Sequence, residues 1–436
     1  MPRSLKPSVS LCLFVLLGMN LSAMCQEIPG TEISAPLAKV SVSGSQRFSS
    51  DVIAAATGLQ KGQVVHRADL QAAADVLAQS GEFKDVQYRY ETERDGVIVE
   101  FAVADAQVIP AYFDNFPWFS SEELSQSLQK AVPLFDGRLP AEGTVVDQVA
   151  QALDKLLESA KVSGTVTHRV LRAPDADQSI QEFQLEGQEL PVEAVFYTDP
   201  LADESRAIHQ SLNQLVGHAY SRYAIDTFDF EQVRPLYESA AHLRVKIGEP
   251  AARFTGDPNQ PLRQSVTVIV PVEPGPAFTW AGVTWIGNSA LSANDLNALV
   301  DLKEGAPADG VKLGGAWAHV SDAYGHIGYL DAEVKPSLEL NDSTARASCK
   351  VTIVEGTQYH MGDMVLSGLS VDGERRIRAG WKIAPGAVFD RAYFDDFLNS
   401  GARASFGAIP FTYTKIGHFL QKDPKTGKVD VMLDFE

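Results

Sequence analysis

The stretch Val283-Thr284-Trp285-Ile286-Gly287-Asn288 decides the fold of this chain, because the earlier stretch Val40-Ser41-Val42-Ser43-Gly44-Ser45 repeats its pattern. With one constant offset, the first copy also aligns with the second at three later pairs of positions: Ser49 with Ser292, Leu59 with Leu302, and Gly62 with Gly305. Self-similarity at a long spacing indicates an array of similar units. Recurrent strands that end in an acidic residue and glycine extend this pattern, so we predict five units of roughly eighty residues each.

Each copy predicts the same order of elements: strand, turn, helix, tight connection, second helix, glycine and two strands. Gly81 and Gly328 follow the second helix, where glycine can end a helix in the left-handed conformation. In the third unit, Pro235 is expected to end or kink the second helix. The predicted fold class is therefore α+β, a tandem array of small β-α-α-β-β units that forms an elongated rod. The predicted units are residues 37–106, 107–188, 189–276, 277–355 and 356–436.

Residues 1–25 predict a secretory signal peptide. Arg3 and Lys6 form its charged start, Leu11–Gly18 is a short apolar run, and Ala23-Met24-Cys25 is a plausible cleavage site. The run is too short for a stable membrane span, and no other stretch is apolar enough to cross a bilayer as a helix. We therefore expect a protein of the periplasm that associates with the outer membrane through its partners.

The cysteines leave a lipid anchor open as an alternative and make a reactive thiol less favoured. Acylation of Cys25 would anchor the chain, although Ser22 and Met24 stand where a lipoprotein signal favours Leu and a small residue. Cys349 cannot form an internal disulfide once residues 1–25 are removed. It lies in a predicted strand, so a small buried residue is favoured over a reactive thiol.

The net charge of the chain excludes some classes of partner. The chain carries a formal charge of −19. Removal of residues 1–25 takes away two cations and no acid, so the remaining chain is more negative still. A strongly acidic protein is repelled by polyanions, so neither nucleic acid nor anionic lipid is an expected partner.

The repeated motif resembles the POTRA (polypeptide-transport-associated) domain. Its pattern is Val-x-Val-x-Gly, a helix, Leu-x-x-Gly, a second helix, Gly-x-Phe-x-x-Val and two strands. In the first unit the pattern falls on Val40, Val42, Gly44, Leu59, Gly62, Gly81, Phe83 and Val86. The fourth unit matches at Gly287-Asn288 and at Gly328–Val334, whereas the second and third units lack the Gly-Asn turn and match by spacing and helix pattern. The resemblance makes Gly44, Gly81, Gly287, Asn288 and Gly328 structural turn residues.

Five such units resemble the periplasmic arm of BamA-type outer-membrane assembly proteins of the surface antigen family. In that family a transmembrane β-barrel follows the fifth unit, and no barrel-like segment is recognised here, so a truncated homologue is one interpretation. The resemblance implies a non-enzymatic scaffold that binds unfolded outer-membrane protein clients or a barrel protein of the assembly machinery. A POTRA-bearing envelope or division protein is the alternative, and a cryptic envelope hydrolase is a remote one.

The resemblance also implies where partners bind. In the family the second strand of each unit lies at a sheet edge, where unpaired backbone groups can accept another strand. The expected edges are 86–90, 165–170, 244–247, 332–335 and 411–415, and the candidate contact residues are Val86, Tyr88, Tyr90, Val166, Val245, Val334, Phe411 and Tyr413. Charge or proline at Arg89, Lys246 and Pro336 favours the opposite interpretation, that an edge is protected.

An aromatic stretch at residues 112–119 has two interpretations. Phe116, Trp118 and Phe119 could form a platform for unfolded clients, since aromatic side chains dominate interface energetics. The alternative, which the sequence favours, is a core strand followed by a hydrophobic contact at the next helix start.

Signals for an enzyme are poor. The nine histidines show no metal-binding spacing, and neither a nucleophile elbow nor a phosphate-binding glycine loop is present. Asp395 and Asp396 are adjacent and so point apart on a helix. We expect no catalytic residues, no metal and no cofactor.

Overall fold

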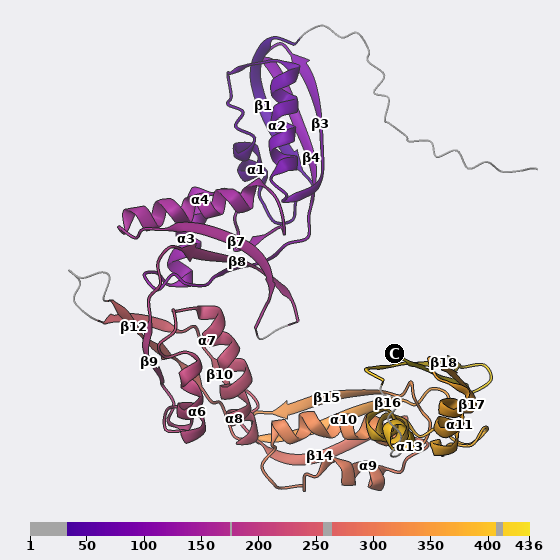
Figure 1. The fold of residues 1–436 in the computed structure, drawn as a ribbon. Helices are drawn as coiled ribbons and strands as arrows, with labels where there is room; N and C mark the ends of the chain where they lie inside the picture. Colours follow the sequence, from indigo (N-terminus) through magenta and orange to yellow (C-terminus); the bar gives the residue numbers. More distant parts are fainter. Residues whose placement is uncertain (1–32, 175–176, 256–263, 407–412) are drawn as a thin grey trace, which may run out of the picture. The chain divides into compact units, whose positions relative to one another are not determined.

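The computed structural model describes residues 33–174, 177–255, 264–406 and 413–436 (Figure 1). The predicted signal peptide lies outside the described residues. Within them, the strands form several small sheets and helices lie between the strands along the chain, which confirms the predicted α+β class. The chain divides into two bodies: the first sheet with its helices is one, and the other four large sheets lie in the second.

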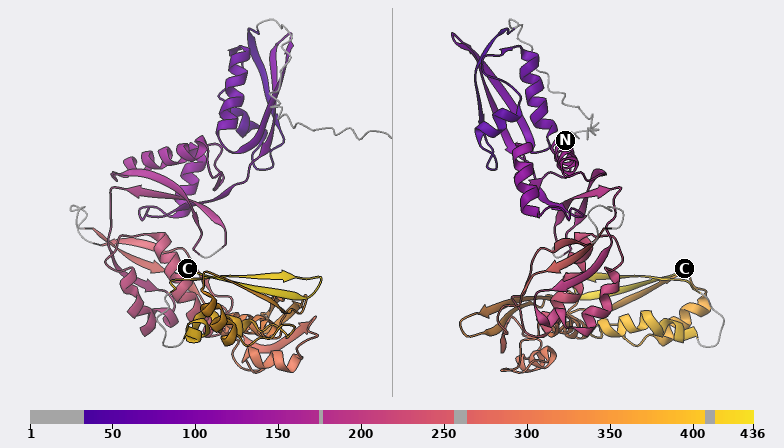
Figure 2. Two further views of the ribbon diagram at one scale, coloured as in Figure 1. Left: turned by 45° about the vertical axis from the view of Figure 1, so that its right-hand side comes forward. Right: turned by 90° about the vertical axis from the view of Figure 1, so that its left-hand side faces the viewer.

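The first sheet has the strand order β2-β1-β4-β3. Its elements are β1 (Ala35–Ser43), α1 (Ser50–Ala56), β2 (Val64–Val65), α2 (Arg67–Gln79), β3 (Phe83–Glu93) and β4 (Gly96–Asp105). Figure 2 shows α2 lying along one face of this sheet. The helix turns Leu70, Ala73, Ala74 and Leu77 inward, as their helical spacing predicts.

The second and third sheets repeat this plan with changes. The second contains β5 (Ile109–Phe113), α3 (Ser121–Ala131), β6 (Arg138–Leu139), α4 (Thr144–Ser159), β7 (Thr165–Arg172) and β8 (Ser179–Glu186). The third contains β9 (Val192–Tyr197), β11 (Ala251–Thr255) and β12 (Ser265–Val270). Its helical segments are α5 (Pro200–Asp203), α6 (Arg206–Ser211), η1 (Leu212–Gln214), α7 (Arg222–Phe228), η2 (Asp229–Val233) and α8 (Arg234–Ser239). A two-stranded ribbon, β10 (Lys246–Ile247) with β13 (Val272–Glu273), adjoins it.

The fourth and fifth sheets have three strands each. The fourth contains β14 (Thr279–Ile286), α9 (Ala293–Val300), α10 (Gly310–His326), β15 (Glu333–Asn341) and β16 (Arg346–Val354). The fifth contains β17 (His360–Ser367), α11 (Val371–Gly380), α12 (Arg391–Asp396), η4 (Phe397–Gly401), α13 (Ala402–Phe406), β18 (Ile416–Asp423) and β19 (Lys428–Phe435).

All five sheets share one topology. The last long strand lies in the middle, parallel to the first strand and antiparallel to the strand that precedes it along the chain; these central strands are β4, β8, β12, β16 and β19. Alternate residues of a central strand face the helices, as Val429, Val431, Leu433 and Phe435 do in the fifth sheet. Each sheet therefore buries one face under its own helices.

The glycines expected at turns have left-handed backbone angles. Gly44, Gly81, Gly287 and Gly328 all have φ between +81° and +104°, a backbone conformation that side chains disfavour. Asn288 completes one of these turns by donating from Nδ2 to the Leu291 carbonyl at 3.0 Å. Among the described residues, no helix combines the length and the apolar character that a bilayer crossing requires.

Candidate functional site

Each large sheet ends in an antiparallel outer strand, which leaves one row of backbone groups without a strand partner inside its own sheet. These outer strands are β3, β7, β11, β15 and β18. At the opposite end of each sheet, the first strand is met by a short antiparallel segment: β2, β6, or an isolated bridge at Ala219, Pro307 or Val388. The outer strands are therefore the more open of the two edges in each sheet.

The first sheet places three candidate residues on its edge as expected. Val86, Tyr88 and Tyr90 alternate along β3, and the Tyr88 ring packs on Phe101 with ring centroids 6.0 Å apart. Tyr88 thus contributes to the inner face of the sheet, whereas Tyr90 is exposed. On the other face, Arg89 forms an exposed ion pair with Glu100 at 2.6 Å on the neighbouring strand, which adds charge to this edge.

The second sheet has its edge where the sequence predicts it, but part of that edge is closed. Val166 lies on β7 and is buried. Its N–H, which does not point into the sheet, donates to Asp154 Oδ1 at 2.8 Å. Asp154 comes from α4, so a helix side chain satisfies one of the donors that an added strand would need.

The predicted edge of the third sheet is wrong. Val245 is buried, and it precedes the short strand β10, which pairs with β13 rather than forming the outer strand. The outer strand is β11, which begins after Pro250. The run Ala251–Thr255 has little apolar character and no clear alternation, so the sequence offered only the preceding proline as a signal for it.

The fourth and fifth sheets differ in how well their edges were predicted. Val334 lies on β15, and Pro336 within that strand removes one backbone donor. In the fifth sheet the expected position, 411–415, is wrong, because the outer strand is β18, a few residues later. Phe411 lies outside the described residues. Tyr413 precedes β18 and packs against Phe435 with ring centroids 5.4 Å apart, so it belongs to the core edge.

The aromatic stretch lies partly in a core and partly along a cavity. Phe116 is buried and meets Phe113 edge-to-face at 6.2 Å, so it belongs to the core of the second sheet. Trp118 and Phe119 are only partly buried and line a cavity of about 400 Å³. Trp118 also packs on Phe254 of β11, with ring centroids 5.8 Å apart. The aromatic segment therefore contacts the outer strand of the third sheet.

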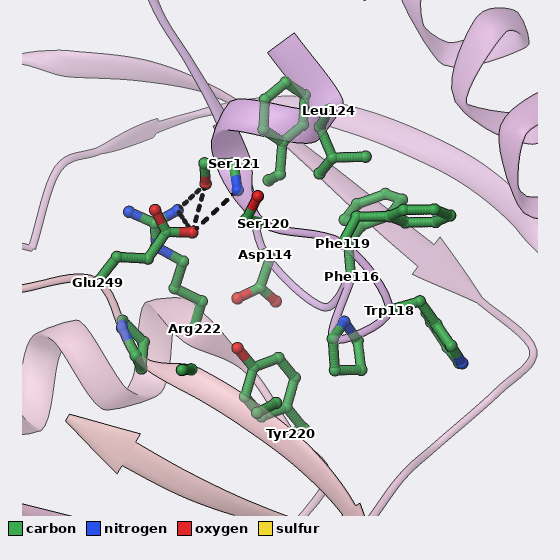
Figure 3. Close-up of a pocket in the computed structure, with 15 residues that line it drawn as sticks. Asp114, Phe116, Trp118, Phe119, Ser120, Ser121, Leu124, Tyr220, Arg222 and Glu249 are labelled. Carbon is green, nitrogen blue, oxygen red and sulfur yellow. Dashed lines mark hydrogen bonds and ion pairs between the residues drawn. The ribbon is translucent and has the colours of Figure 1, made fainter. Parts of the chain in front are cut away.

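Figure 3 shows the residues that line this cavity, which include polar and charged side chains. Asp114 is 3% exposed, and its Oδ1 accepts hydrogen bonds from Ser221 Oγ at 2.9 Å and from the Tyr223 amide at 2.7 Å. Burial raises the pKa of this carboxyl group. At another side of the cavity, Arg222 and Glu249 form an ion pair at 3.2 Å.

Comparison with known proteins finds one family model in two segments of the chain. Residues 35–105 and 278–356 match the POTRA family model, described as a surface antigen variable number repeat. The chain thus carries POTRA domains at its first and fourth sheets, and it resembles the arms of BamA-type outer-membrane assembly factors.

One curated protein and several solved structures are similar to parts of the chain. A protein of Treponema pallidum (strain Nichols) named an outer membrane protein assembly factor is 25% identical over 172 residues, which cover 39% of this chain and 20% of that protein. The chain thus spans about a fifth of the curated relative it matches. Among solved structures, POTRA domains 3–5 of Haemophilus influenzae BamA align over 58% of this chain and 98% of theirs, with 12% identity and a TM-score of 0.39. The N-terminal domain of Omp85 from Thermosynechococcus elongatus aligns over 57% and 98%, with 14% identity and a TM-score of 0.25.

Proposed function

We propose that this chain is a non-enzymatic periplasmic scaffold that binds unfolded outer-membrane proteins, or a barrel protein of their assembly machinery, by strand addition. The POTRA matches and the name of the curated relative support a role in outer-membrane protein assembly. The predicted signal peptide supports the compartment. The strand-addition mechanism is supported by the outer strands of the sheets.

The same proposal treats all five sheets as POTRA-like units with the boundaries expected from the sequence. The second, third and fifth sheets lie outside the matched segments, but they share the central last strand and the antiparallel outer strand of the two matched sheets. A common topology supports a common use, in which several outer strands are offered along one chain.

The outer strand β18 gives the strongest support for strand addition. It is free of proline, and Phe419 on it is 61% exposed. Lys415 and Glu436 exchange both backbone hydrogen bonds at the entrance to the strand, and pairing in an antiparallel ladder alternates from one residue to the next. The N–H groups of His418 and Leu420 therefore point away from β19, where an incoming strand could accept them.

Replacing His418 tests the mechanism. His418→Pro removes an outward donor and leaves the ladder to β19 intact, so we expect several-fold weaker crosslinking to partners from a photoreactive residue at position 421. His418→Gln keeps the N–H and loses the same ring contact with Phe394, so its crosslinking should stay within about twofold of the parent. Circular dichroism would establish that both variants are folded.

The outcomes separate the parts of the proposal. Equal crosslinking by folded proline and glutamine variants would contradict strand addition at this edge. Partners recovered only from the division septum would contradict a role in outer-membrane protein assembly and leave strand addition standing.

A further inference from the structure

The cavity beside β11 combines a backbone edge with a specific side-chain environment. Its lining includes Trp118 and Phe119 from the segment before α3, Tyr220 before α7, and Ala251 and Ala252 at the start of β11. Because β11 is an outer strand, a polypeptide paired with it would pass directly beside this cavity.

The alternation of β11 determines which side of an added strand faces the cavity. Ala252 and Phe254 lie on the same face, since they are two residues apart. Phe254 packs against Trp118, so that face is turned toward the aromatic lining. In an added strand, the residue opposite Ala252 would point its side chain to the same face. Ala252 itself is small and leaves room there.

The charged groups at the rim neutralise one another. Arg222 Nη1 donates to Ser121 Oγ and is 3.2 Å from Glu249 Oε1. Ser121 donates to the same Glu249 oxygen from its hydroxyl group at 2.6 Å and from its amide at 3.1 Å. The Arg222 guanidinium also lies over the Tyr112 ring, 4.9 Å from its centroid. These contacts already pair the Arg222 guanidinium with the Glu249 carboxylate, so a charged ligand gains less from either group.

One acceptor in the cavity remains available. Both hydrogen bonds to the Asp114 carboxylate are made to Oδ1, and in the part of the chain that the structure describes Oδ2 accepts none. Figure 3 shows this carboxylate among the lining residues, between the Trp118 and Phe119 side and the Arg222 and Glu249 side. An unpaired oxygen on a carboxylate side chain that is only 3% exposed favours a ligand that brings a donor.

We propose that this cavity holds an aromatic side chain that ends in a hydrogen-bond donor, foremost tyrosine, from a strand paired with β11. Its ring packs against Trp118 and Phe119, and its hydroxyl group donates to Asp114 Oδ2. The proposal rests on the proposed function and adds a side-chain preference to it. The occupant is an extended client segment with tyrosine at one position and no requirement for charge.

Three matched peptides test this preference on the full chain. Each is an alternating strand sequence with tyrosine, O-methyltyrosine or phenylalanine at its centre, and dissociation constants are measured by fluorescence anisotropy. The methyl ether keeps the ring and the oxygen but has no donor. We expect tyrosine to bind about tenfold more tightly than the other two, which is typical of a hydrogen bond to a charged group.

Asp114→Asn keeps the size of the side chain and an acceptor for Ser221 and Tyr223, but it removes the negative charge of the carboxylate. We expect it to reduce the preference for tyrosine over O-methyltyrosine to less than about threefold. Asp229→Asn is the control, since Asp229 is equally buried and accepts from a hydroxyl group but does not line this cavity. It should keep the full preference.

The location is tested with a photoreactive benzoylphenylalanine at the peptide centre. Crosslinks to residues 116–119 or 250–252 support the proposal, and crosslinks confined to other parts of the chain overturn it. Equal affinity for the three peptides also overturns it and leaves strand addition intact. Failure of every peptide to bind would instead count against the proposed function itself.

Discussion

Glycine 287 allows two strands to approach more closely than any side chain permits. An added Cβ would lie 2.3 Å from the Ile353 carbonyl oxygen of the central strand. Gly44 and Gly368 occupy the same place in the first and fifth sheets, with the Val103 and Phe435 oxygens at 2.0 and 1.9 Å from such an atom. The glycine after the first strand is therefore required by this contact as well as by its positive φ.

Alanine substitutions separate the two requirements. Gly305 has φ +85°, close to the +84° of Gly287, but nothing lies within 4 Å of an added Cβ. We expect Gly305→Ala to lower the free energy of unfolding by about 1 kcal/mol and Gly287→Ala by at least about 2 kcal/mol more. Urea denaturation followed by Trp fluorescence would measure both. Equal losses would show that the close contact is relieved at little cost.

The second and third sheets replace this glycine by hydrogen-bonding side chains. Asn115 pairs with the backbone of Leu185, accepting from its amide at 2.7 Å and donating to its carbonyl at 2.9 Å. Thr198 accepts from the Val272 amide at 2.8 Å. In these two sheets a side chain therefore hydrogen-bonds to the backbone near the end of the central strand, where the other sheets have a glycine turn. This is a physical reason why the glycine after the first strand marks the first, fourth and fifth units in the sequence but not the second and third.

Asp229 makes a pH-dependent contribution to stability. It is 3% exposed, accepts from the Tyr197 hydroxyl group at 2.7 Å, and within the described residues its Oδ2 has no partner. Burial raises the pKa of Asp229 to about 7. Because this pKa is raised in the folded state, its stabilising contribution is full below the unfolded pKa, near 4, and is lost as the pH rises through about 7.

Asp229→Asn tests this linkage. The variant cannot ionise and still accepts from Tyr197, so we expect it to match the parent near pH 4. Its advantage should grow above that pH and reach a few kcal/mol at pH 8. Urea unfolding at several pH values measures the difference between the two proteins. A difference that does not change with pH would contradict the raised pKa.

At the scale of elements, the helix pattern was predicted well and the outer strands less well. Helix α2 follows its apolar stripe, and the central strands follow their alternation, because both bury a regular face. An outer strand has one paired side and little burial, so its sequence is less constrained. This explains the wrong positions for β11 and β18, and it explains why the aromatic cavity could be anticipated only as a group of aromatic residues.

The second helix of the third sheet shows how a proline is accommodated. Pro235 was expected to end or kink the helix. The helical run instead passes through a π-turn at η2 and begins α8 with Pro235 in its first turn, where no N–H is needed. The fifth sheet has a similar π-turn, η4, without a proline. The proline alone therefore does not account for this feature.

Protection of β7 by Asp154 leads to a prediction about this element. Asp154→Ala releases the Val166 N–H from its side-chain partner, so the edge should become more open to other strands. We expect greater self-association in sedimentation velocity and stronger crosslinking from a photoreactive residue at position 170. Glu158→Ala, an exposed acid on the same helix, should leave both unchanged. No increase for Asp154→Ala would show that other features protect this edge.

At the scale of the whole molecule, charge limits the surfaces that the chain can bind. Its formal net charge is −19. We expect no greater flotation with vesicles that contain phosphatidylglycerol than with purely zwitterionic vesicles at low salt, because anionic lipid repels an acidic protein. A preference for the anionic vesicles would reveal a basic surface that the net charge conceals, and it would contradict the expectation that membrane association requires partners.

The shared topology also has a temporal aspect. In each of the five large sheets the strand between the other two long strands is the last one to be synthesised, from β4 in the first sheet to β19 in the fifth. While a chain emerges from a ribosome or a translocation channel, the first strand and the helices of a unit cannot complete their sheet until that final strand is available. The entropy of loop closure is lost before the non-local strand contacts form. Each unit is thus completed in a single late step, and its outer strand becomes a sheet edge only when that unit closes.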